Sequence, residues 1–186
     1  DDNAKRWERY HQGLRKLSKR RGLIGLIFTK PQTKINDPAK LHLLIRMIDS
    51  EDWSSLDVDV KGEVYEGLLA RNAEDVRGGA GQYFTPRPVI RAIVEIMRPK
   101  PTMRISDPAC GTGGFLLAAF EYLKGKTANA KEAAYLRTRA LHGVDLVPNV
   151  ARLCGMNLFL HGIGTDYEHP VISIGDSLGS KAEPVD

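Results

Sequence analysis

The sequence predicts an α/β protein, in which a helical N-terminal segment precedes a parallel β-sheet with crossover helices. Two observations predict this fold. Apolar residues recur at helical spacing through the first 76 residues, and the later part alternates apolar segments in the order strand, helix, strand, helix, strand. Such alternation is typical of parallel sheets with right-handed crossovers. We therefore expect a helical domain at 1–76 and a sheet-containing domain at 77–186.

The N-terminal segment is expected to be helical throughout. Its apolar stripes consist of Leu41, Leu44, Ile45 and Ile48, and of Val64, Leu68 and Leu69. Asp37 before Pro38 predicts a helix start, because the carboxylate can accept hydrogen bonds from free amides and proline fits the first turn. Residues 77–88 are rich in glycine and proline, so the domain boundary is expected there.

The second part contains three expected strands. In chain order we expect a helix at 89–97, a strand at 104–107, helices at 113–123 and 133–139, a strand at 141–145, a helix from Pro148 to His161, and a strand at 171–174. An acid ends or follows each strand: Asp107, Asp145 and Asp176. Aspartate is also common in turns and helix caps. The carboxyl ends of parallel strands form one edge where ligands bind, so three acids in register indicate a site.

The stretch S-D-P-A-C-G-T-G-G-F at 106–115 lies between the first strand and its helix. Its glycines allow a tight turn and close approach to a ligand, and the helix that follows directs free amides at an anionic group. A nucleoside triphosphate is disfavoured because no lysine follows the glycines. The glycine spacing also departs from the dinucleotide fingerprint G-x-G-x-x-G.

Composition and charge narrow the protein classes. No apolar run approaches the roughly 20 residues that span a bilayer, and the N-terminus is polar, which predicts a cytoplasmic protein. The two cysteines, Cys110 and Cys154, suggest neither a disulfide framework nor a metal site, and we expect free thiols.

The positive charge is concentrated at the N-terminus. Residues 1–30 carry nine basic and three acidic residues, whereas the chain as a whole carries 27 and 23. A basic cluster there consists of Arg15, Lys16, Lys19, Arg20 and Arg21. These residues are candidates for contacts with nucleic-acid phosphates, and the alternative is a solvated helix face.

Residues 107–115, D-P-A-C-G-T-G-G-F, closely resemble the S-adenosylmethionine-binding motif of N6-adenine DNA methyltransferases, especially the modification subunit of type I restriction-modification systems. The upstream G-Q-Y-F-T-P at 81–86 resembles the second cofactor motif of that family, and V-Y-E-G-L-L at 64–69 is similar to part of its N-terminal domain. The resemblance covers nearly the whole chain. It implies a Rossmann-like methyltransferase domain, of which three parallel strands are present before the fourth.

The resemblance also implies roles for individual residues. The implied cofactor-binding residues are Tyr83, Phe84, Thr85, Pro86, Asp107, Pro108, Ala109, Cys110, Gly111, Thr112, Gly113, Gly114, Phe115, Asp145 and Asp176. Residues 83–86 would contact the methionine part, and Asp107 with the glycine backbone would hold its amino and carboxylate groups. Asp145 would accept the ribose hydroxyls, and Asp176 the adenine amino group. The alternative for Tyr83 and Phe84 is packing between domains.

The sequence contains no Asn-Pro-Pro-aromatic stretch, which carries catalysis in the family by binding a flipped-out adenine. We expect that stretch to lie beyond Asp186, and therefore assign no catalytic residue within the chain. The expected protein is a DNA adenine methyltransferase subunit that is inactive alone, with DNA, a specificity subunit, a restriction subunit and a second methyltransferase subunit as partners.

One further expectation depends on the same resemblance. If the chain ends before the fourth strand, the strand at 104–107 would be an open edge, which favours association.

Two alternative functions remain open. One is a non-catalytic S-adenosylmethionine-binding or interaction module, and the other is an NAD enzyme, which the glycine spacing and F-T-P disfavour.

Overall fold

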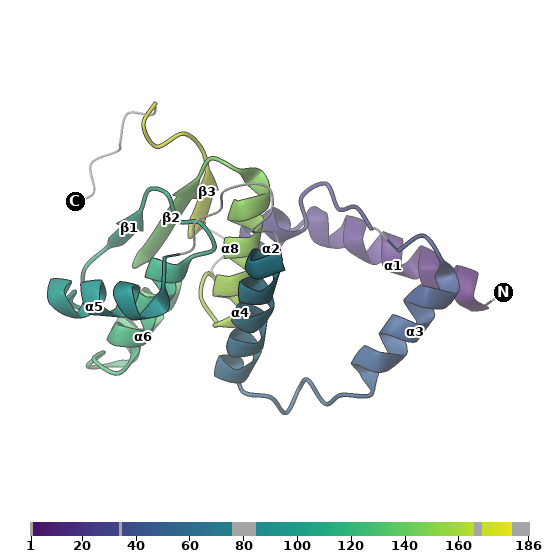
Figure 1. Ribbon diagram of the computed structural model, residues 1–186, viewed down its shortest axis with the longest axis horizontal. Coiled ribbons are helices and arrows are strands. Elements are labelled where there is room, and N and C mark those ends of the chain that lie inside the picture. Colours follow the sequence, from purple (N-terminus) through teal and green to yellow (C-terminus); the bar gives the residue numbers. More distant parts are fainter. Residues whose placement is uncertain (1, 34, 76–84, 166–168, 180–186) are drawn as a thin grey trace.

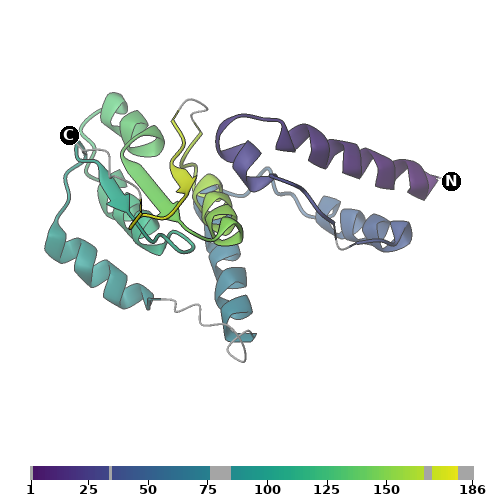
Figure 2. The same cartoon turned by 90° about the horizontal axis from the view of Figure 1, so that it is seen from above.

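The computed structural model describes residues 2–33, 35–75, 85–165 and 169–179, except the side chains of 58, 59, 70 and 72–75. Its elements are α1 (Asp2–Ser18), α2 (Gly22–Ile27), α3 (Pro38–Asp49), α4 (Val58–Asp75), α5 (Arg87–Met97), β1 (Ile105–Asp107), α6 (Gly114–Lys124), α7 (Ala130–Thr138), β2 (Leu141–Asp145), α8 (Pro148–Leu160) and β3 (Ile172–Ile174). Helices α1 and α3 extend to one side of the part that contains the sheet (Figures 1 and 2).

The N-terminal segment is not helical throughout, which corrects the expectation from its apolar stripes. Residues 19–21, 28–33, 35–37 and 50–57 lie outside its helices. Of the two longer gaps, the first contains Pro31, which has no backbone amide to donate. It ends as predicted at Asp37, whose Oδ1 accepts the N–H groups of Ala39 (2.8 Å) and Lys40 (3.4 Å). In the second gap the Asp52 carboxylate accepts hydrogen bonds from neighbouring serines, which stabilises a turn in place of a helix.

The sheet has the order β1-β2-β3 among the described residues, and both pairs are parallel, which confirms the predicted α/β fold. Asp107 of β1 is in register with Gly143 of β2, and Asp145 is in register with Ile174 of β3. Two crossovers that step in the same direction place α6 and α8 on the same face of the sheet. A side chain at position 143 would lie within 3 Å of Cys110, Leu116 and Ile172, so glycine allows α6 to pack closely on β2.

The main core lies between α6, α8 and this face of the sheet. Its largest fully buried side chains include Phe120 and Leu123 of α6 and Leu158 of α8. Leu23 and Ile27 of α2 belong to the same core, although they come from the N-terminal segment. The expected domain boundary falls partly on residues outside the described part of the chain, and the division at 76/77 stays a prediction.

Helix α5 packs on α6 through Ile90 and Val94, which are buried. The other apolar residues of its expected face, Val89, Ile93 and Met97, are exposed. The helix ends as predicted at Arg98, which adopts φ 47°, before Pro99. None of the helices in the described part of the chain has the length and apolar character needed to cross a membrane.

Candidate cofactor site

The three predicted acids lie where the three strands end. Asp107 is the last residue of β1, Asp145 the last of β2, and Asp176 comes two residues after β3. The loop after β3 contacts the loop after β1, because Ser177 Oγ donates a hydrogen bond to Pro108 O. Asp107 and Asp145 are partly buried, and Asp176 is exposed. The structure therefore places these carboxylates at the carboxyl edge of the sheet, together with the glycine-rich stretch.

The glycine-rich stretch forms a loop in which Gly111 and Gly113 have positive φ, +55° and +88°. An L-residue with a Cβ rarely adopts this conformation. Among the described residues, no atom lies within 4 Å of a Cβ built at Gly111, so this part of the loop borders open space there. A Cβ at Gly113 would instead lie 2.8 Å from Cys154 Sγ. Gly113 faces the core, whereas Gly111 borders space that a ligand can enter.

Asp145 holds the loop on the end of β2. Its Oδ2 accepts the Gly111 N–H (3.1 Å), and its Oδ1 accepts the Val147 N–H (2.8 Å). Next to this contact, the Cys110 N–H donates to Val144 O (2.9 Å). A carboxylate has lone pairs for further donors, so Asp145 can support the loop and still accept ribose hydroxyls.

Asp107 carries a carboxyl group in an unfavourable electrostatic environment. Burial raises the pKa of Asp107, and the charge of Asp145 raises it further, while the hydrogen bond from the Ala109 N–H (3.1 Å) lowers it. A cationic group bound between these two carboxylates would offset both effects. The amino group of an amino acid is such a cation.

Cys110 and Cys154 are both free, as expected, and both are buried. A hydrogen bond with the Cys110 thiol, together with burial, raises the pKa of Cys154. A raised pKa keeps this thiol protonated and therefore a poor nucleophile. Both cysteines belong to the buried core cluster, and they contribute to the packing beneath the loop.

The upstream motif is only partly described. Tyr83 and Phe84 lie outside the described residues, while Thr85 and Pro86 are exposed next to the start of α5. That start lies against the glycine loop, because Arg87 Nη1 donates to Gly114 O (3.1 Å). The five basic residues are all exposed and lie at the end of α1 and just after it: Arg15, Lys16, Lys19, Arg20 and Arg21. Their exposure suits both phosphate contacts and a solvated face.

The expected place of the catalytic stretch also falls outside the described part of the chain. The described residues end at 179. The stretch is expected beyond Asp186, which is not among the described residues. Two expectations therefore stay predictions: the position of the catalytic stretch beyond Asp186, and the open edge at β1 that would follow from it.

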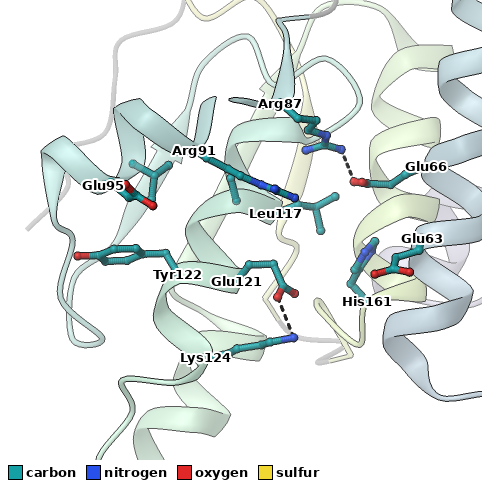
Figure 3. Close-up of a pocket in the computed structure, with 12 residues that line it drawn as sticks. Glu63, Glu66, Arg87, Arg91, Glu95, Leu117, Glu121, Tyr122, Lys124 and His161 are labelled. Carbon is teal, nitrogen blue, oxygen red and sulfur yellow. Dashed lines mark hydrogen bonds and ion pairs between the residues drawn. The ribbon is translucent and has the colours of Figure 1, made fainter. Parts of the chain in front are cut away.

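A separate open cavity of about 400 Å³ lies between α4, α5 and α6 (Figure 3). Four of its charged side chains form ion pairs, Arg87 with Glu66 and Lys124 with Glu121. None of the three strand-ending acids lines it. This cavity is therefore distinct from the sheet edge at which the motif residues gather.

Sequence reasoning missed three residues that hold the glycine loop: Arg87, Asn157 and Ser177. Each donates a side-chain hydrogen bond to a backbone carbonyl of residues 108–114. For Arg87 the only sequence signal of such a role was its position directly after the F-T-P motif. Asn157 lies in an apolar helix, where a polar side chain at a core position calls for a partner.

Comparisons with known proteins agree with this architecture. A family model described as N-6 DNA Methylase matches residues 56–186. The methylase subunits of the type I restriction enzymes StySPI from Salmonella potsdam and EcoKI from Escherichia coli K12 are 39% and 38% identical over 171 residues. Both alignments cover 87% of this chain and 32% of the relative, so the chain spans about a third of the length of these relatives.

A solved structure of a type I modification subunit is also similar to this chain. The modification subunit of a putative type I restriction enzyme from Vibrio vulnificus YJ016 superposes with a TM-score of 0.74 at 29% identity, over 89% of this chain and 35% of that one. These similarities agree with the parallel sheet and with the glycine motif between β1 and α6. The chain belongs to the N-6 DNA methylase family, and its relatives there are methylase subunits of type I restriction enzymes.

Proposed function

We propose that the chain forms the S-adenosylmethionine-binding part of a type I methylase subunit, which transfers a methyl group to N6 of adenine in DNA. One observation carries the cofactor assignment. The loop of the D-P-A-C-G-T-G-G-F motif is held on Asp145 through the Gly111 N–H, and a half-buried Asp107 lies beside it. The membership of the N-6 DNA methylase family supports the reaction class.

The residues of the sheet edge fit the parts of this cofactor. Asp107 would pair with its amino group, and the amides at the start of α6 would receive its carboxylate. Asp145 would accept the ribose hydroxyls and Asp176 the adenine amino group. The open space over Gly111 admits a ligand close to the backbone. Residues 83–86 would complete the pocket on the methionine side.

When bound, the cofactor supplies an electrophilic methyl group, and the residues of this chain bind and orient it. The adenine-binding Asn-Pro-Pro-aromatic stretch of the family does not occur in the 186 residues. We therefore propose that this chain alone binds the cofactor and does not methylate DNA. The proposed partners are DNA, a second methylase subunit, and the specificity and restriction subunits, with the basic residues of 15–21 contacting DNA phosphates.

Calorimetric titration of the chain with S-adenosylmethionine and with NAD tests the cofactor assignment. We expect binding of S-adenosylmethionine only. Binding of NAD alone, or of neither compound, would contradict the proposal. A methylation assay with adenine-containing DNA then distinguishes a complete enzyme from a cofactor-binding part, and methyl transfer by the chain alone would contradict the second half of the proposal.

The alternative function, a non-catalytic S-adenosylmethionine-binding module, makes a different prediction for assembly. A methylase part should increase methyl transfer when it is combined with the remaining two thirds of a related subunit in a complementation assay. A module that only binds the cofactor should leave methyl transfer at zero in that assay.

A further inference from the structure

Two side chains from distant helices hold the carbonyl groups on either side of Gly113. Arg87 Nη1 of α5 donates to Gly114 O (3.1 Å), and Asn157 Nδ2 of α8 donates to Thr112 O (3.0 Å). A peptide group is planar, so a bound carbonyl also fixes the direction of the N–H on the same plane. The two contacts therefore help to fix the peptide groups at 112–113 and 114–115, the first of which also donates its Gly113 N–H to Cys110 O (2.8 Å).

Arg87 is held from a second side by the N-terminal segment. Its Nη2 forms an ion pair with Glu66 of α4, and Figure 3 shows the two side chains pointing toward each other. Position 114 accommodates this arrangement because it is glycine: a Cβ there would lie 3.4 Å from Arg87 Nη1 and 3.1 Å from Ile90 Cδ1. Glu66 belongs to the V-Y-E-G-L-L stretch, in which the neighbouring Tyr65 hydroxyl contacts Met156 Sδ of α8 (3.6 Å).

Asn157 is fully buried, and only one of its two polar side-chain atoms has a hydrogen-bond partner among the described residues. Nδ2 is bound to the loop, while Oδ1 has no hydrogen-bond partner among the described residues. A buried acceptor without a partner costs free energy, which an apolar residue of similar size would avoid. The contact with Thr112 O is the one feature of the described surroundings that an apolar residue would lose.

We propose that Arg87 and Asn157 are positioning residues that hold the glycine loop in the conformation that binds the cofactor, and that Glu66 orients Arg87 for this role. The inference rests on the proposed function for the identity of the ligand. The loop is thereby anchored to three helices besides its own: α5, α8 and, through Glu66, α4. Preorganisation of this kind raises affinity because less conformational freedom is lost on binding.

Two measurements on the full chain test the proposal. The first is amide hydrogen exchange of residues 111–115 without ligand, and the second is calorimetric titration with S-adenosylmethionine. We expect Arg87→Ala to speed exchange in the loop without changing β2, and to weaken S-adenosylmethionine binding about tenfold. Asn157→Ala should have both effects as well. The matched control is Arg91→Ala, an exposed arginine one turn later on α5, which should change neither.

Glu66→Gln tests whether Glu66 acts through Arg87. Because this substitution is nearly isosteric, the loss of affinity in the wild-type background can be measured even if Arg87→Ala does not fold. We expect about a threefold loss of affinity in the wild-type background and no further loss in the Arg87→Ala background. The control Glu63→Gln, one turn earlier in the same cavity, should leave affinity unchanged. A structural role without coupling would give independent effects of Glu66 and Arg87.

The outcomes separate this inference from the proposed function. If wild-type chain does not bind S-adenosylmethionine, the proposed function fails, and the exchange measurement alone decides whether the loop is held. Unchanged loop exchange in both Arg87→Ala and Asn157→Ala overturns the inference. Faster exchange with unchanged affinity overturns it too, because the contacts would then not serve binding.

Discussion

Replacing Gly113 by alanine should lower the free energy of unfolding by about 1–5 kcal/mol. A left-handed conformation such as the φ of +88° at this residue costs an L-residue about 1–2 kcal/mol. The new Cβ would also lie 2.8 Å from Cys154 Sγ and 3.7 Å from Leu158 Cδ2, both buried, and such overpacking typically costs about 1–3 kcal/mol. The reduced entropy of the unfolded chain returns about 0.4–1 kcal/mol. Urea unfolding followed by circular dichroism measures the change.

Two other glycines separate strain from overpacking. Gly111→Ala has the strain of φ +55° but no overpacking, so after the same entropy contribution it should cost about 0–1.6 kcal/mol. Gly125 has φ −83°, and no described atom lies within 4 Å of a Cβ built there, so Gly125→Ala should stabilise by about 0.4–1 kcal/mol. Equal losses at 111 and 113 would refute the proposed contact with Cys154, and wild-type stability of Gly113→Ala would refute the whole argument.

Four further predictions concern ligand binding and folding. Burial raises the pKa of Asp107 above its usual 3.8, so S-adenosylmethionine affinity should fall as the pH is lowered into that raised range, and Asp107→Asn should remove this dependence in calorimetric titrations. The free energy of unfolding has the opposite pH dependence. Ionisation of Asp107 lowers it as the pH rises through the raised pKa, so Asp107→Asn should be more stable than wild type at neutral pH. Asp145→Ala removes the acceptor of the Gly111 N–H and should weaken S-adenosylmethionine binding about tenfold or more; unchanged affinity would remove its assigned role. Combined replacement of Arg15, Lys19 and Arg20 by alanine should lower the salt dependence of DNA binding, by a slope of about 0.9 per lost phosphate contact, and an unchanged slope would indicate a solvated face.

Local sequence signals predicted most of the elements near the site. The strand at 141–145 agrees residue for residue with β2, and the helix start at Asp37 is confirmed by its two amide contacts. These features depend on neighbouring residues, such as an apolar run or a carboxylate beside a proline. The expectation of continuous helix to residue 76 was wrong at 19–21, 28–33, 35–37 and 50–57. In the two longer gaps Pro31 and the Asp52 turn outweigh the apolar periodicity.

The apolar face of the helix after the upstream motif shows the limit of periodicity. Val89, Ile90, Ile93, Val94 and Met97 follow helical spacing, and all lie in α5. Of these five, Ile90 and Val94 are buried. Periodicity shows that a helix is amphipathic, while the width of the buried stripe depends on which neighbours pack against it.

The sequence by itself determined the three parallel strands, the acids at their ends and the glycine motif between β1 and α6, because spacing and residue type along the chain express these features. Tertiary structure alone decided how the loop is held. Thr112 O is bound by Asn157, 45 residues later, and Gly114 O by Arg87, 27 residues earlier. Hydrogen bonds of this kind follow from the packing of α5 and α8 around the loop, and no local pattern encodes a partner at such a distance.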